Sequence, residues 1–224
     1  MLTPVAPALW AVNAPLSVYG MALGHRMTVV RLPDTALWVH SPIAFSEPLL
    51  DELHQLGVLT HIVAPNCLHD TYLKAWISAC PKVRFHAAQG FSDHRPDLKI
   101  TSFLSDTPLP EWDGVIDQLL LRGAPRVNEI IFLHRTSRTL IITDLCFNLG
   151  PEMSLLSRLL LTLNDSYGKF GPSRMLRSAI KDPAAFRSSL NHVLRWDFDR
   201  IILSHGEIIE HGGREMLRSA FAFI

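Results

Sequence analysis

Short runs of apolar residues, separated by turn residues, mark the first part of the chain. β-branched and aromatic side chains are frequent in these runs, and prolines and glycines lie between them, as in an antiparallel meander. A helix is predicted next, because Ser46 can cap its first turn and Gly57 can end it. The predicted segments are strands at residues 9–12, 27–32 and 37–40 and a helix at residues 46–56.

The middle of the chain alternates between strand and helix patterns. Apolar runs at residues 58–64 and 83–87 predict strands, and apolar positions at helical spacing between His69 and Cys80 predict a helix. Two strands joined by a helix usually pair in parallel, with the helix covering one face of the sheet. This unit indicates an α/β protein.

The second half predicts a hairpin followed mainly by helices. Strands are expected at residues 115–121, 129–134, 139–144 and 200–203. Helices are expected at residues 151–163, 173–180 and 183–196 and from residue 213 onward. A chain of 224 residues that is 48% hydrophobic can bury one core, so we expect residues 1–224 to form a single domain.

Charge and cysteine content narrow the choice of partner and compartment. Because 21 lysines and arginines balance 21 aspartates and glutamates, no overall charge attracts the chain to nucleic acid or an anionic membrane. A small molecule or another protein fits this charge balance better, and we expect a small-molecule substrate. No apolar run reaches the length of a membrane helix. Three scattered cysteines and a start without a basic region favour a reducing, cytoplasmic location.

Polar side chains that can bind metal or move a proton follow several of the predicted strands. Ligands bind outside the carboxyl ends of strands in α/β sheets, so these side chains are candidates for one shared site. Hairpin geometry places Asp144 opposite Glu129 and puts His134 at the far end of the sheet, which excludes His134. The candidates are His40, Asn66, His69, Asp70, Asp144 and His205.

Structural interpretations compete with functional ones at these positions. Asn66 is a natural turn former, and the residues at 69–70 also suit the start of a helix. Asp144 is harder to explain structurally, because a carboxylate buried at a strand end needs a partner. His205 precedes Gly206, which permits a tight turn that would present the imidazole.

The order of elements and the strand-end residues together resemble the metallo-β-lactamase superfamily. Within it, the chain more closely resembles an uncharacterised bacterial and plant branch that is described only as a domain of unknown function. The segments that carry the closer resemblance are residues 27–32, 37–42 and 64–66 with His69, and residues 132–140 leading to Asp144. The resemblance implies an αββα sandwich of two mixed sheets flanked by helices, with a metal site at one edge.

The histidine-rich metal motif of the superfamily is only partly matched. Its pattern, His-x-His-x-Asp-His, falls on Asn66, Leu68, Asp70 and Thr71. Asp144 matches the bridging aspartate of the superfamily and His205 its terminal histidine. The resemblance therefore implies a reduced, mononuclear site, in which Asp70, Asp144 and His205, with His69 assisting, hold one divalent ion of zinc, iron or manganese.

These residues lead to three hypotheses. In the first, the chain is a hydrolase-like, metal-dependent enzyme acting on a small organic substrate, with Asp144, His205 and His69 as its catalytic residues. In the second, it is a metal-free binding module on the same fold. In the third, it is a metal-independent enzyme in which His205 acts as a general base oriented by Asp144. Only the third predicts activity that survives exhaustive chelation.

Overall fold

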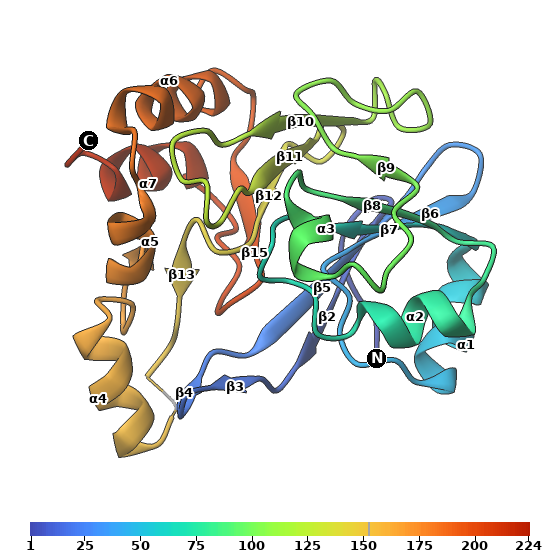
Figure 1. Cartoon of the computed structure of the whole chain (residues 1–224), viewed down its shortest axis with the longest axis horizontal. Coiled ribbons are helices and arrows are strands. Elements are labelled where there is room, and N and C mark those ends of the chain that lie inside the picture. The colour runs from blue at the N-terminus through green and yellow to red at the C-terminus, as the bar shows by residue number, and fades with distance from the viewer. Residues whose placement is uncertain (152) are drawn as a thin grey trace.

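Two mixed β-sheets form the centre of the computed structural model, which describes residues 1–151 and 153–224 (Figure 1). The larger sheet contains, in spatial order, β1 (Thr3–Ala6), β2 (Leu9–Ala14), β5 (His25–Arg31), β6 (Ala36–His40), β7 (Val58–Ala64), β8 (Arg84–Ala87) and β9 (Ser102–Phe103). The smaller contains β10 (Ile116–Leu120), β11 (Ile130–His134), β12 (Thr139–Ile142) and β15 (Arg200–Leu203). Two short strand pairs lie outside both sheets: β3 (Ser17–Val18) with β4 (Met21–Ala22), and β13 (Phe147–Asn148) with β14 (Phe170–Gly171).

Helices flank the two sheets on opposite sides (Figure 1). On one side lie α1 (Glu47–Leu56), α2 (Leu73–Ala79) and α3 (Phe91–His94). On the other lie α4 (Leu155–Leu163), α5 (Arg174–Ala179), α6 (Pro183–Val193) and α7 (Gly213–Ala220). Among the described residues, no helix is long and apolar enough to cross a membrane.

Three apolar clusters fill the spaces between the layers. The central cluster joins the two sheets through Val30, Trp38, Val63, Phe132, Ile141 and Ile202. Leu53 of α1 and Trp76 of α2 belong to the cluster on the outer side of the larger sheet. Phe186 of α6 and Leu217 of α7 belong to the cluster on the outer side of the smaller sheet. Alternate strand residues face opposite sides of a sheet, so each sheet contributes to the central cluster on one face and to an outer cluster on the other. Each sheet therefore buries both faces, and the αββα sandwich implied by the resemblance is confirmed.

Several local predictions are confirmed by hydrogen bonds. The hydroxyl of Ser46 accepts from the backbone N–H of Leu49 at the start of α1. Strands β7 and β8, which helix α2 connects in the chain, pair in parallel. Helix α6 begins at Pro183 as predicted, and the carboxylate of Asp182 caps it.

The helix predicted at residues 151–163 begins at Leu155, with residue 152 outside the described residues, and the one predicted at 183–196 ends at Val193. Two further segments are shorter than expected, and both of these differences lie beside the site. The helix expected from His69 begins at Leu73, because the side-chain oxygen of Asn66 accepts from the N–H groups of residues 68 and 69 and holds them in a turn. The strand expected at 139–144 ends at Ile142. The N–H groups of residues 143 and 144 donate to the carboxylate of Glu129 instead of to a neighbouring strand.

Candidate metal centre

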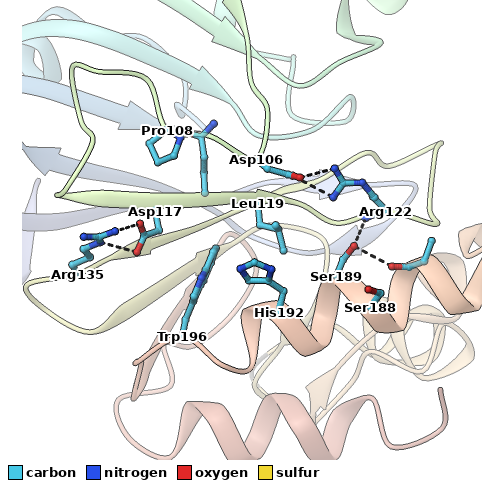
Figure 2. Close-up of a pocket in the computed structure, with 12 residues that line it drawn as sticks. Asp106, Pro108, Asp117, Leu119, Arg122, Arg135, Ser188, Ser189, His192 and Trp196 are labelled. Carbon is cyan, nitrogen blue, oxygen red and sulfur yellow. Dashed lines mark hydrogen bonds and ion pairs between the residues drawn. The ribbon is translucent and has the colours of Figure 1, made fainter.

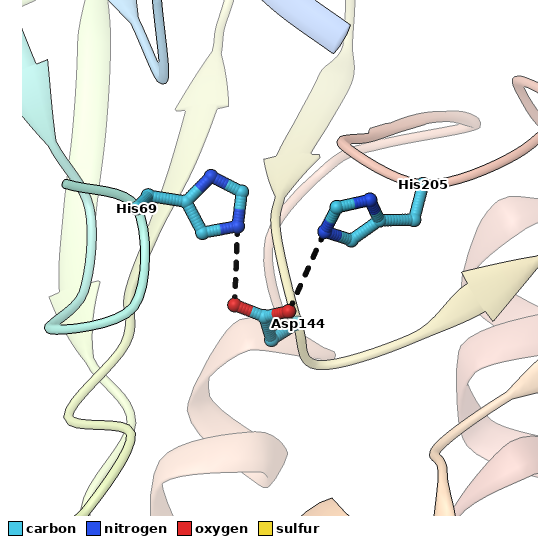
Figure 3. Close-up of side chains that lie close together, drawn as sticks. All are labelled: His69, Asp144 and His205. Carbon is cyan, nitrogen blue, oxygen red and sulfur yellow. Dashed lines mark ion pairs between the residues drawn. The ribbon is translucent and has the colours of Figure 1, made fainter. Parts of the chain in front are cut away.

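Three buried side chains, His69, Asp144 and His205, come together beyond the carboxyl ends of β7, β12 and β15 (Figure 3). His69 Nε2 lies 3.1 Å from Asp144 Oδ2, and His205 Nε2 lies 3.6 Å from Asp144 Oδ1. One ligand atom from each residue lies within 4.8 Å of the other two. The structure thus brings together three of the four residues that the sequence proposed as metal ligands.

Strand pairing and one asparagine explain why these segments meet. Strands β12 and β15 are parallel neighbours with Ile142 opposite Leu203, so their carboxyl ends lie side by side. Strand β7 belongs to the other sheet, and Asn66 bridges the gap beyond its end. The Asn66 amide nitrogen donates to Asp144 Oδ2 at 2.7 Å and to the Thr143 hydroxyl at 3.0 Å.

The hydrogen bond at Nδ1 fixes the tautomer of a neutral His205 ring. Nδ1 lies 2.7 Å from the carbonyl oxygen of Gly24, and a carbonyl oxygen can only accept, so Nδ1 carries a proton. Nε2 is therefore the nitrogen that faces Asp144. The ring stacks on Phe147, with centroids 5.3 Å apart and planes inclined by 10°. Gly206 has a φ of +100°, and a Cβ there would lie 2.1 Å from the Asn148 carbonyl oxygen, so the turn requires glycine.

Ser41 and His25 complete the surroundings of His69. Ser41 Oγ lies 2.5 Å from His69 Nδ1 and 3.0 Å from His25 Nε2. Burial, and to a smaller extent the nearby His69, lowers the pKa of His25 to about 3. The sequence reasoning missed both residues as members of the site. Strand β5 is antiparallel to β6, so its first residue lies at the same sheet edge as the end of β6, and this position is the signal that identifies His25.

Burial and neighbouring charges determine the protonation of the carboxyl groups. Burial alone would raise the pKa of Asp144, but His69 and His205 hold that pKa well below its usual value. Glu129 lies directly behind Asp144, as the hairpin geometry predicted, and accepts the Asp144 N–H at 3.0 Å. Burial and the charge of Asp144 raise the pKa of Glu129 to about 8.

The candidates Asp70 and His40, and the excluded His134, lie outside the three-residue cluster. Asp70, predicted as a ligand, is not brought to it; its carboxylate pairs with Arg95 at 3.3 Å, a partner 25 residues away that sequence spacing did not suggest. His40 is buried and stacks on Trp38 with ring centroids 5.5 Å apart. His134 contacts Ser137 at 2.7 Å, at the turn end of the hairpin. Of the four predicted ligands, only His69, Asp144 and His205 lie together.

The cluster opens into a cavity. The cavity at the cluster has a volume of about 460 Å³ and includes all three cluster residues in its lining. A larger cavity of about 770 Å³ lies between β10 and α6, and none of the three lines it (Figure 2). Its two arginines, Arg122 and Arg135, are already paired with Asp106 and Asp117. Because the three clustered side chains line the smaller cavity, we take it as the candidate site although the other cavity is larger.

Residues 7–162 match the family described as a domain of unknown function (DUF4336). No curated protein matches the chain in sequence. Three solved structures illustrate the fold.

The DIM-1 metallo-β-lactamase has a TM-score of 0.69 at 15% identity and covers 100% of this chain and 97% of its own. FIM-1 from Pseudomonas aeruginosa, in its mono-zinc form, has a TM-score of 0.66 at 12% identity, covering 100% and 95%. A metal-soaked Flv1 flavodiiron core from Synechocystis has a TM-score of 0.68 at 13% identity, covering 100% and 60%. At these identities the likeness shows the fold alone, which is that of the metallo-β-lactamases.

Proposed function

The chain belongs to the DUF4336 family, and from that premise we propose that it is a hydrolase-like enzyme whose His69, Asp144 and His205 hold one divalent metal ion. Two imidazoles and one carboxylate form a donor set that suits zinc, and also iron or manganese. The mono-zinc form of the lactamase and the metal-soaked flavodiiron core have the same fold, which supports metal binding by this chain.

The orientation of His205 is the observation that carries the proposal. Its Nδ1 donates to the Gly24 carbonyl, so a neutral ring turns the Nε2 lone pair toward Asp144 Oδ1 at 3.6 Å. Two lone pairs facing each other at that distance repel. A cation between them, or a proton on Nε2, removes the repulsion. Histidines that bind metal commonly donate their second ring N–H to a backbone carbonyl in this way.

Each neighbouring residue has a role in holding this arrangement. The hydroxyl of Ser41 fixes the plane of the His69 ring, and the amide of Asn66 holds Oδ2 of Asp144. When bound, a divalent ion would supply Lewis acidity, which activates water and polarises a carbonyl oxygen. The surrounding side chains bury the cluster and limit the access of bulk water.

A metal-independent enzyme is the second candidate, and the same His205–Asp144 pair favours it. If a proton occupies His205 Nε2, the buried carboxylate of Asp144 holds the ring as an imidazolium. Loss of that proton would make His205 a general base. The residues are the same in both candidates, so only the dependence on metal separates them.

The cellular compartment and the class of substrate are also part of the proposal. Cys67, Cys80 and Cys146 are free thiols, which supports a reducing, cytoplasmic compartment. The cavity beside the cluster has the size of a small-molecule site, which supports a small organic substrate over a macromolecule.

Hydrolysis of 4-nitrophenyl acetate before and after chelation tests the proposal. We expect the metal-loaded protein to lose at least about 90% of its activity on chelation and to recover it when zinc, iron or manganese is returned, because metal-assisted hydrolysis stops without the ion. His54→Ala, which removes an exposed histidine of α1, is the matched control and keeps full activity. Activity that survives chelation but disappears in His205→Ala would instead support the acid–base candidate.

A further inference from the structure

The cavity beside the cluster has a largely apolar wall. Apolar side chains from the β3–β4 hairpin and its flanks form one part of it, and Phe147, which stacks on His205, adds an aromatic ring. The hairpin is anchored, because the N–H of Ala22 donates to the Ser157 hydroxyl of α4 at 2.8 Å. The hairpin and flanking residues in the wall are Leu16, Val18, Tyr19, Met21 and Leu23. The wall is therefore a supported surface rather than a free loop.

Charge is nearly absent from this wall. No lysine, arginine or glutamate among the described residues lines the cavity, and Asp144 is its single carboxylate. A ligand carrying a carboxylate or phosphate in the cavity would lose its hydration without gaining a paired cation from the wall. Thr71, Tyr72 and Asn164 supply neutral polar groups only. The wall is suited to the uncharged part of a ligand.

The rim of the cavity is also apolar and open. Tyr19 is 93% exposed, Met175 is 55% exposed and Leu68 is 46% exposed, and all three line the cavity. They come from the β3–β4 hairpin, from α5 and from the turn before α2. Apolar side chains that remain exposed around a cavity mark a surface that an apolar ligand can cover.

We propose that the substrate is an uncharged ester with a medium-length alkyl acyl chain, which lies against this wall with its carbonyl at the cluster. The inference rests on the proposed hydrolytic function. Water supplies the oxygen of the new acyl C–O bond, the ester C–O bond breaks, and the alcohol leaves with a proton. No other reactant is needed. The acid product ionises, and away from the cluster the cavity wall offers its carboxylate no cation.

Binding of neutral amides to the metal-loaded protein tests the ligand class without relying on turnover. Butyramide and octanamide are titrated by calorimetry. Burial of one CH₂ group changes affinity by up to roughly fourfold, so we expect octanamide to bind at least about tenfold more tightly than butyramide. Met175→Glu places a carboxylate at the rim, and we expect it to weaken octanamide binding at least about fivefold while metal per chain stays constant.

Met216→Glu is the matched control, because Met216 is an exposed methionine of α7 that does not line this cavity. It keeps the affinity for octanamide. Equal affinities for the two amides, or an unchanged affinity in Met175→Glu, would overturn the assignment of the ligand class. Tight, rim-dependent octanamide binding by a protein that holds no metal would support the ligand class and contradict the proposed function, so the two failures are distinguishable.

Discussion

A single contact at Nδ1 orients each of the two histidines that face Asp144. His205 donates to the Gly24 carbonyl at 2.7 Å, and His69 lies 2.5 Å from Ser41 Oγ. In both rings Nε2 is left to face the carboxylate, which gives one oxygen to each. The arrangement depends as much on the residues behind the imidazoles as on the imidazoles themselves.

Ser41→Ala tests the contribution of this surrounding layer. We expect metal affinity to fall about 10- to 100-fold, because His69 loses the partner that fixes its ring. The measurement is competition with a chelating dye. Ser102→Ala is the matched control, since Ser102 makes a similar 2.7 Å contact to the ring of His86 away from the cluster. Equal metal affinity in the wild type and in Ser41→Ala would show that Ser41 has no positioning role.

The sequence identified some site residues and not others for physical reasons. Asp144 and His205 are visible because each follows an apolar strand whose end must lie at one edge of the sheet. His25 is hidden, since it begins a strand, and only the antiparallel pairing with β6 brings it to the same edge. Asp70, predicted as a ligand, pairs instead with Arg95, a long-range contact that spacing does not reveal.

At the level of elements, the turns that follow β7 and β15 place the site residues more directly than the strands do. Asn66 replaces the start of the predicted helix by a turn that carries His69. Gly206 lets the chain after β15 pass close to Asn148. The strands were predicted from apolar runs, whereas the exact end of each depended on side-chain hydrogen bonds that compete with regular pairing.

Gly206→Ala tests the tight turn after His205. The substitution would place a Cβ 2.1 Å from a carbonyl oxygen at a φ of +100°. We expect a loss of at least about 2 kcal/mol in the free energy of unfolding, because strain and steric overlap add. Thermal unfolding should show a midpoint several degrees lower, on the order of 2–4 °C per kcal/mol.

Gly114→Ala separates the effect of backbone strain from the effect of steric overlap. Gly114 also has a positive φ, of +78°, but no atom lies within 4 Å of an added Cβ. Its replacement therefore reports the backbone strain alone and should cost about 1–2 kcal/mol. If Gly206→Ala were no more destabilising than Gly114→Ala, the close approach at Asn148 would not be a constraint.

At the level of the whole molecule, two sheets with three apolar layers bury a large number of imidazoles. His86 and His134 are both 1% exposed, and they lie outside the three-residue cluster. Burial, together with His61, lowers the pKa of His86 to about 3, and burial lowers that of His134 to about 4. The αββα layering was foreseeable from the resemblance, but which histidines it would bury depended on tertiary packing.

These buried histidines predict a loss of stability in mild acid. Their folded pKa values lie below the ordinary value of about 6.5, so below pH 6.5 the unfolded chain takes up protons that the folded chain does not. The contribution of each such histidine to stability is fully present above about pH 6.5 and falls toward pH 4, by about 1.4 kcal/mol per pH unit. Urea unfolding of the protein between pH 7.5 and 4.5 measures the slope. A shallower slope is expected in His134→Gln, and a flat profile in the wild type would contradict the burial of neutral imidazoles.

The metal content of the purified protein tests the central claim most directly. Plasma mass spectrometry should give about one equivalent of zinc, iron or manganese per chain in the wild type and in the exposed-surface control His54→Ala, and less than about a tenth of that in Asp144→Ala and His205→Ala. A wild-type chain that holds no metal even after soaking, or full metal content in both cluster variants, would contradict a metal centre at His69, Asp144 and His205.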